Sequence, residues 1–186
     1  ITYTYGRIIA RYSPTGEENY FGQFEFSFES GSAYTADMLE AVAMQVYVLD
    51  GKIVKVDGLL NHQIDVKFLE EIAEEFKRRF DDVQVDKILT VEASGIAIAC
   101  MCAPLFGYPP VVFAKKAAPS TMNEGFYEAE AKSFTKGTVS KLKVAEKYVN
   151  EGEKILNIDD FMASGEASAA MARIVEEAGA DIVGIG

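Results

Sequence analysis

Cysteine and histidine are scarce in this chain, and their scarcity excludes several kinds of protein. The 186 residues include only two cysteines and one histidine. Two cysteines are too few for a disulfide framework, so we interpret Cys100 and Cys102 as small, reduced residues inside a buried helix. The single histidine, His62, excludes a metal site built from several histidines and argues against structural zinc. We assign it no catalytic role.

Positive charge and long apolar runs are also scarce. The chain has 18 lysines and arginines against 29 aspartates and glutamates, a formal net charge of −11. Binding to a nucleic-acid backbone relies on clustered cations, so this balance argues against a nucleic-acid partner. No apolar run approaches the roughly 18 to 20 residues that span a bilayer, and we expect no secretory signal. We therefore predict a cytoplasmic protein without a membrane partner.

The amino-terminal part of the chain differs in composition from the rest. Residues 1–37 contain nine aromatic side chains, and residues 22–29 alternate apolar and polar as a half-buried strand does. No residue pattern there indicates chemistry. We predict that residues 1–37 are a segment of separate origin and that residues 38–186 form the functional domain. The alternative is a hairpin that packs against that domain.

From Met38 onward, helical and strand-like patterns alternate along the chain. This alternation predicts an α/β fold: a doubly wound, mainly parallel sheet with flanking helices. Asp65 is placed to cap a helix, and Glu74–Arg78 and Glu75–Arg79 have the spacing of ion pairs on that helix. We expect helices over residues 38–48, 66–80, 96–105 and 167–178, and strands over residues 87–91, 110–114, 127–134, 139–144, 155–158 and 181–185.

Two predicted strand-to-helix turns have the composition of anion-binding loops. In an open parallel sheet, ligands bind at the carboxyl ends of the strands, where helix N-termini converge. The first turn, Glu92–Ile96, contains Ser94-Gly95, which by itself is a weak signal because such turns are common. A strongly acidic protein that binds phosphates must depend on such local devices, on a few placed cations, or on Mg²⁺.

The second turn carries the stronger signal. The apolar strand 155–158 leads to Asp159-Asp160, and a small loop with a glycine then opens a helix. The two carboxylates can accept hydrogen bonds from vicinal sugar hydroxyls or lie near a divalent cation. The N–H groups of the loop and the helix dipole can hold one phosphate. One strand, loop and helix can thus bind a ribose and its 5′-phosphate; the alternative is that the aspartates only end the strand.

The strand, the acidic pair and the loop resemble the phosphoribosyl pyrophosphate signature of the type I phosphoribosyltransferases. Further segments, in the expected order and spacing, resemble the bacterial xanthine phosphoribosyltransferases, and the resemblance covers about residues 38–186. Asn61-His62-Gln63 is the part most specific to that subfamily. The matching segments are residues 55–65 (purine site), 90–97 (pyrophosphate loop), 110–116 and 133–136.

The resemblance implies a role for each site residue. Val54 and Asn61 would contact xanthine, and Asp159 and Asp160 would be the catalytic pair that holds the ribose hydroxyls. Residues 117–126 would form a mobile loop over the reaction. The residues that would bind phosphoribosyl pyrophosphate are Ser94, Gly95, Lys115, Lys116, Ala163, Ser164, Gly165, Glu166 and Ala167.

The resemblance also implies a cofactor and partners. Mg²⁺ would arrive bound to phosphoribosyl pyrophosphate, with no protein ligand assigned to the metal, and the enzyme would be a homodimer with Lys115 and Lys116 near its interface. We expect the Glu166 side chain to turn away from the 5′-phosphate because like charges repel. In the family, a later strand supplies a lysine to the purine. The chain stops at Gly186, so we expect a domain shortened at its carboxyl end.

The predicted activity is purine salvage: xanthine and phosphoribosyl pyrophosphate would give xanthosine 5′-monophosphate and pyrophosphate. Two alternatives remain open. One is a regulatory domain that senses phosphoribosyl pyrophosphate, and the other is an inactive, truncated remnant of the enzyme. The residue types alone suit any oxopurine, so the choice of xanthine depends on the resemblance.

Overall fold

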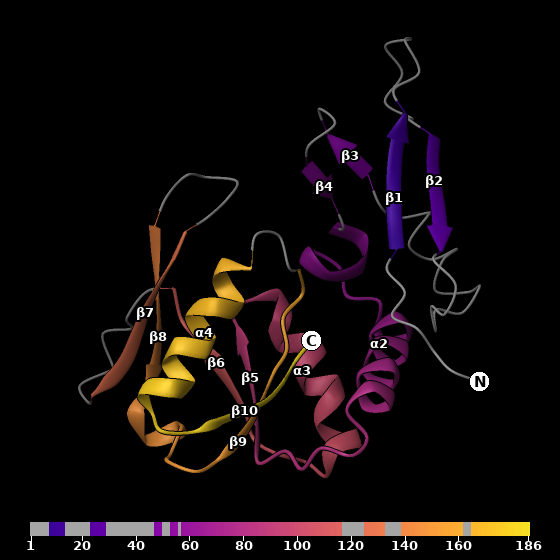
Figure 1. Ribbon diagram of the computed structural model, residues 1–186. Coiled ribbons are helices and arrows are strands. Elements are labelled where there is room, and N and C mark those ends of the chain that lie inside the picture. The colour runs from indigo at the N-terminus through magenta and orange to yellow at the C-terminus, as the bar shows by residue number, and fades with distance from the viewer. Residues whose placement is uncertain are drawn as a thin grey trace. The chain divides into compact units, whose positions relative to one another are not determined.

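The computed structural model describes residues 8–13, 23–28, 47–49, 53–55, 57–116, 125–132, 139–161 and 165–186 (Figure 1). The chain divides into two compact units, residues 1–68 and 69–186. The division falls inside helix α2 (Val66–Arg79). The predicted boundary at residues 37/38 lies outside the described residues and stays a prediction.

The first unit contains two small antiparallel pairs of strands. β1 (Ile8–Ser13) pairs with β2 (Gln23–Phe28), so the alternating segment near residue 25 forms one strand of a hairpin. β3 (Tyr47–Leu49) pairs with β4 (Ile53–Lys55). The helix expected over residues 38–48 is therefore wrong at Tyr47 and Val48, where backbone pairing with β4 prevails; its remainder lies outside the described residues.

A short π-helix, Asp57–Asn61, precedes α2. Asp65 caps α2 as expected, because its Oδ1 accepts a hydrogen bond from the Phe68 N–H at 3.1 Å. Further along the same helix, Glu75 binds both Arg78 and Arg79, which includes the expected pair with Arg79.

The second unit is built on a four-stranded, wholly parallel sheet. The strand order is β10-β9-β5-β6, so the chain crosses over between strands that are not consecutive in sequence. This confirms the predicted doubly wound, mainly parallel sheet. Its strands and the two following helices are β5 (Lys87–Val91), α3 (Ser94–Cys102), β6 (Val111–Ala114), β9 (Lys154–Asn157), α4 (Glu166–Glu177) and β10 (Asp181–Ile185).

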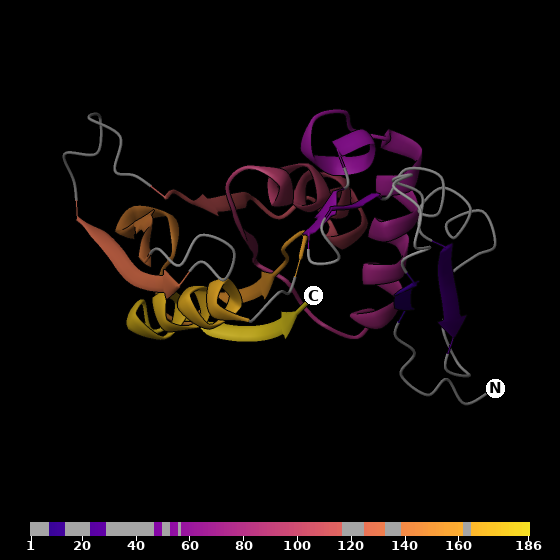
Figure 2. The ribbon, with the colours of Figure 1, turned by 90° about the horizontal axis from the view of Figure 1, so that it is seen from above.

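Helices cover both faces of this sheet (Figure 2). α4 packs through Met171 and Ile174 into a core with Leu89 and Ile155. α3 packs on the other face against β5 and β6. The ring of Phe80, just after α2, lies on β10 on that second face, since a side chain at Gly184 would overlap it. These apolar layers fix the strands whose carboxyl ends carry the polar residues.

An antiparallel hairpin, β7 (Phe126–Lys132) and β8 (Val139–Ala145), flanks the sheet and packs with α4. It joins β6 through Lys115 and Lys143, whose backbones exchange two hydrogen bonds of 2.9 Å. Both strands of the hairpin were expected from alternation. The hairpin is thus a separate sheet that meets the parallel sheet at one isolated antiparallel bridge beyond the end of β6.

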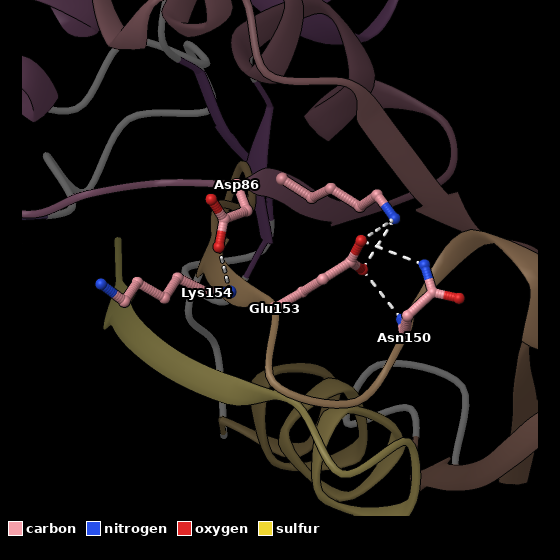
Figure 3. Close-up of polar contacts among 5 residues, drawn as sticks. Asp86, Asn150, Glu153 and Lys154 are labelled. Atoms are coloured by element: carbon pink, nitrogen blue, oxygen red, sulfur yellow. Dashed lines mark hydrogen bonds and ion pairs between the residues drawn. The ribbon is translucent and has the colours of Figure 1, made fainter.

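Polar contacts tie the amino ends of β5 and β9 together (Figure 3). Lys87 Nζ lies 2.7 Å from both carboxylate oxygens of Glu153, which also accept hydrogen bonds from the backbone and side-chain amides of Asn150. Beside them, Asp86 and Lys154 exchange hydrogen bonds of 2.8 and 2.9 Å. These contacts hold β5 beside β9. They thereby also fix the register of the two strands at their carboxyl ends.

Two expectations about the helix after β5 need correction. The helix begins at Ser94 rather than Ile96 and ends at Cys102, because Pro104 lies in a separate 3-10 turn, Ala103–Phe106. Cys102 is buried and burial raises the pKa of its thiol to about 12, but Cys100 is exposed. The prediction that both cysteines are buried is therefore wrong for Cys100, which the apolar surroundings in the sequence did not reveal.

Candidate active site at the carboxyl edge of the sheet

Three loops meet at the carboxyl edge of the parallel sheet. Asp159-Asp160 follows β9, Glu92–Gly95 follows β5, and Lys115-Lys116 follows β6. Because β5 lies between β9 and β6, the acidic pair and the lysines stand on either side of the β5 loop. The edge thus combines carboxylates, a small-residue turn and cations within one unit, which suits a ligand with both hydroxyl and phosphate groups.

The acidic pair is held by short-range hydrogen bonds. Asp159 Oδ1 accepts from the Asp160 N–H at 3.0 Å, and Asp160 Oδ1 accepts from the Phe161 N–H at 2.9 Å. The Asp159 N–H donates to the Gly186 carbonyl at 3.1 Å, which extends the pairing of β9 with β10. The backbone of the pair is therefore fixed, with one oxygen of each carboxylate engaged in these contacts.

Asp159 has an unusual proton affinity. The pKa of Asp159 is raised to about 6, chiefly by burial and also by the neighbouring Asp160 carboxylate, whereas the hydrogen bond from the Asp160 N–H and the Lys116 charge oppose the rise. Asp159 is therefore ionised only above about pH 6. Lys116, which follows β6 on the far side of the β5 loop, lowers the pKa of Asp159 through its positive charge.

Gly95 lies where these groups crowd together. A Cβ at this position would stand 2.9 Å from Asp159 Oδ1 and would overlap the Thr90 hydroxyl. Glycine is therefore required for packing, in addition to the close approach to an anion that the sequence suggested. Thr90 is fully buried, and its Oγ1 has no hydrogen-bond partner within the described part of the chain.

Glu92 connects the β5 loop to the lysines. Its N–H donates to the Ala114 carbonyl at 3.1 Å, and its carboxylate accepts from the Lys116 N–H at 2.6 Å. Lys115 is held from the other side by Lys143 of β8. Each of the two lysine backbones is thus fixed by a different element.

The N-terminus of α4 has the geometry expected of a phosphate-binding turn. Gly165 precedes the helix with φ of +77°, a conformation that other residues adopt only with strain. No side chain caps this helix within the described residues. The amides of Glu166 and Ala167 in its first turn can therefore donate to an anion, with a favourable helix dipole.

The structure brings most of the predicted site residues to one edge. Asp159, Asp160, Ser94, Gly95, Lys115, Lys116, Gly165, Glu166 and Ala167 all follow the carboxyl ends of β5, β6 and β9. Ala163 and Ser164, and residues 117–124 of the expected mobile loop, lie outside the described residues. Val54 in β4 and Asn61 at the end of the π-helix belong to the other unit, and their predicted contacts with xanthine stay predictions.

Two residues of the site were missed by sequence reasoning. Both belong to segment 90–97, which resembles a pyrophosphate loop, but neither was given a role of its own. The buried hydroxyl of Thr90 beside Asp159 could not be foreseen, because it depends on which strand lies next to β5. For Glu92, a carboxylate directly before a Ser-Gly turn was an available signal, but its partner lies 24 residues away.

The described residues contain neither a cluster of typical metal ligands nor a membrane-spanning helix. No group of three or more histidine, cysteine or acidic side chains there could hold a metal ion. The carboxylate oxygens of Asp159 and Asp160 are nevertheless of the type that accompanies Mg²⁺ bound to a phosphorylated sugar. None of the described helices is long and apolar enough to cross a bilayer.

Similar curated proteins include xanthine phosphoribosyltransferases of several bacteria. The chain is 49% identical over 147 residues to xanthine phosphoribosyltransferase 1 of Clostridium perfringens, covering 79% of this chain and 77% of the relative. It is 53% identical over 134 residues to the xanthine phosphoribosyltransferase of Clostridium novyi, covering 72% and 70%. The enzyme of Staphylococcus carnosus is 50% identical over 139 residues, covering 75% and 72%. No protein-family profile matches the chain.

Solved structures with a similar fold are adenine phosphoribosyltransferases. That of Rhodothermus marinus has a TM-score of 0.64 at 20% identity and covers 82% of this chain and 85% of its own. That of Trypanosoma brucei, in complex with AMP, pyrophosphate and ribose-5-phosphate, has a TM-score of 0.65 at 17% identity and covers 85% and 68%. At these identities the likeness establishes the fold alone.

Proposed function

The chain belongs to the family of the xanthine phosphoribosyltransferases, and from that premise we propose that it is a purine-salvage enzyme. It would convert xanthine and phosphoribosyl pyrophosphate to xanthosine 5′-monophosphate and pyrophosphate. The observation that carries the proposal is the identity of 49 to 53% to relatives of that name, of which this chain covers at least 70%. The acidic pair and the glycine-led helix at the carboxyl edge supply matching chemistry.

Each part of the substrate has a proposed place on this edge. Asp159 and Asp160 accept hydrogen bonds from the two ribose hydroxyls, and both must be ionised to accept fully. The 5′-phosphate is bound by amides of residues 163–167, including those of the first turn of α4. The diphosphate lies at Ser94-Gly95, with Lys115 and Lys116 supplying positive charge.

The reaction is a displacement at the anomeric carbon of the ribose. The bond to the pyrophosphate oxygen breaks, pyrophosphate leaves with the electron pair, and a purine nitrogen forms the new bond and loses its proton. Positive charge builds on the sugar as the leaving group departs, so the negative charge of Asp159 and Asp160 at the ribose hydroxyls is favourable. Mg²⁺ carried by the diphosphate would neutralise the charge on the leaving group. The protein contributes orientation and electrostatics.

The proposal extends to assembly and location. We propose a homodimer in the cytoplasm, with xanthine contacted by Val54 and Asn61. α3 supports an interface because it is apolar all round, yet Cys100 on it is exposed. Light scattering of the purified protein tests the dimer: a monomer at all concentrations would contradict it.

A steady-state assay tests the activity. Purified protein is given phosphoribosyl pyrophosphate, Mg²⁺ and either xanthine, guanine or hypoxanthine, beside a variant with Asp159→Asn and Asp160→Asn. We expect xanthosine monophosphate to form fastest and the variant to lose most of the activity. Binding of phosphoribosyl pyrophosphate without any product would favour the sensor or the inactive remnant.

A further inference from the structure

Glu92 makes two hydrogen bonds to the chain at and just beyond the end of β6. Its own N–H donates to the Ala114 carbonyl at 3.1 Å and so extends the ladder between β5 and β6 by one residue. Its carboxylate then reaches further and accepts from the Lys116 N–H at 2.6 Å. A short hydrogen bond from an amide to a carboxylate is stronger than one between neutral groups. The β5 loop and the lysine segment are therefore joined beyond the point at which the sheet ends.

Lys116 needs such a bond because nothing else in the described structure fixes its backbone. The side chain is exposed, and β6 ends two residues earlier, at Ala114. The adjacent Lys115 is held differently, by paired backbone hydrogen bonds to Lys143 of β8. Yet the charge of Lys116 acts on Asp159, which follows a strand that is not adjacent to β6. The two residues thus act on one another across the loop that follows β5.

The carboxylate of Glu92 lies beside the turn proposed for a diphosphate. A free carboxylate there would repel a polyanionic ligand. In this structure one of its oxygens accepts a hydrogen bond from the Lys116 amide, so the carboxylate fixes the backbone of a residue that carries a cation. The same side chain thus accounts for both the position of Lys116 and the tolerance of an acidic residue at this loop.

We propose that Glu92 is a positioning residue that holds Lys116 at the carboxyl edge, so that its ammonium neutralises the diphosphate of the bound substrate. Glu92 itself touches neither substrate. The inference depends on the proposed function for the identity of the ligand, and it gives a role to a residue outside the proposed ligand contacts.

Three variants test this role through the kinetics of phosphoribosyl pyrophosphate. Glu92→Ala removes the acceptor and should raise KM for phosphoribosyl pyrophosphate about tenfold, with kcat and the KM for xanthine changed much less. Glu92→Gln keeps an acceptor oxygen for the Lys116 amide and should restore most of the affinity. Glu177→Ala, at the exposed far end of α4, is the matched control and should behave as the wild type.

A double-mutant cycle separates positioning from a general structural effect. If Glu92 acts through Lys116, Glu92→Ala should cost little further affinity in a Lys116→Ala background. Additive losses, an unchanged KM in Glu92→Ala, or a failure of Glu92→Gln to recover affinity would each overturn the proposal. Circular dichroism and thermal melting of every variant identify any loss that comes from misfolding, and the Gln variant then decides the question.

Failure of the proposed function has a different signature. If the wild type forms no nucleotide, calorimetric titration with phosphoribosyl pyrophosphate and Mg²⁺ replaces kinetics, and the same order of affinities is expected. Binding without turnover, with Glu92→Ala weaker than Glu92→Gln, would keep Glu92's role and reject the enzyme. No binding by the folded wild type would reject both.

Discussion

At Asp159 two physical demands conflict. The carboxylate must be ionised to accept hydrogen bonds from ribose hydroxyls, but burial and the adjacent Asp160 disfavour its charge and raise its pKa to about 6. The unfolded chain has no such cost, and an aspartate there ionises near pH 3.9. Folding is therefore favoured by this group below its unfolded pKa, and that contribution is lost as the pH rises through about 6. At neutral pH the charged Asp159 therefore lowers the free energy of unfolding of the protein.

Asp159→Asn should stabilise the protein at high pH. Removing a charge that folding disfavours should raise the free energy of unfolding at pH 8 by about 1–2 kcal/mol, after allowance for solvent screening of a partly exposed group. At pH 4 the gain should shrink towards zero, because Asp159 is then protonated in the folded wild type. Urea unfolding at both pH values measures this difference. The expectation would be contradicted if the variant gained less stability over the wild type at pH 8 than at pH 4.

Asn157 is a second residue whose environment is costly. Its side chain is 1% exposed, and neither its oxygen nor its nitrogen has a hydrogen-bond partner in the part of the chain that the structure describes. It lies beside Leu89 of β5, among apolar residues of the sheet. A buried amide without partners costs roughly 1–3 kcal/mol. This cost falls two residues before the acidic pair.

Asn157→Val should therefore raise stability by about 1 kcal/mol, since valine suits a buried strand and leaves no polar atom unpaired. Thermal melting beside the wild type provides the measurement, and a conservative control is Ile155→Val in the same strand, which should lose about 1 kcal/mol. A loss of stability in Asn157→Val would mean that the amide has a partner outside the described residues.

Among the elements, β5 and β9 depend on a polar junction at their amino ends. Burial acts to raise the pKa of Glu153, but hydrogen bonds from Lys87 and Asn150 outweigh it and leave that pKa below its usual value. A lowered pKa means that the contribution to stability is present above the unfolded pKa and is lost as the pH falls through the folded one. The junction should thus hold the two strands in register at neutral pH.

Glu153→Gln should lower the free energy of unfolding at pH 7 by about 1–2 kcal/mol, because Lys87 loses its charged partner. The deficit should shrink below pH 4, where the wild-type carboxylate also takes up a proton. Denaturant unfolding at pH 7 and pH 3.5 tests this, with Glu177→Gln on α4 as the control. A deficit that persists unchanged in acid would show that the charge is not its cause.

For the whole molecule, the division into two units separates the proposed ligand contacts. All proposed contacts with phosphoribosyl pyrophosphate belong to residues 69–186, whereas Val54 and Asn61 belong to residues 1–68. A protein with a net charge of −11 repels this anion at long range, so binding must depend on local amides and lysines.

Phosphoribosyl pyrophosphate with Mg²⁺ should protect only the second unit from hydrogen exchange. Ligand at about 100 times its dissociation constant stabilises the folded protein by roughly 2.7 kcal/mol. This slows hydrogen exchange that requires global opening by about a hundredfold. We expect protection in peptides covering residues 88–96, 111–116 and 155–170, and none in β1 or β2. Mass spectrometry of the exchanged full chain gives the measurement. Equal protection of the β1–β2 hairpin would contradict this separation.

Much of the second unit could be predicted because its signals are local. The strand Lys87–Val91 and the strand Asp181–Ile185 were expected with the bounds observed, and the helix after Asp65 begins where its cap requires. The acidic pair and the glycine-led helix were identified from adjacent residues alone. Local propensity was insufficient at Tyr47 and Val48, where pairing with another strand prevails over a weak helical pattern.

The sequence by itself determined the kinds of element in residues 69–186, the two loops with the chemistry of a phosphorylated sugar, and the family. Only the tertiary structure decided that β9 and β6 lie on either side of β5, because strand order depends on packing between residues far apart in the chain. That order makes Gly95 a neighbour of Asp159, brings the charge of Lys116 within reach of the acidic pair, and gives Glu92 its bond to Lys116.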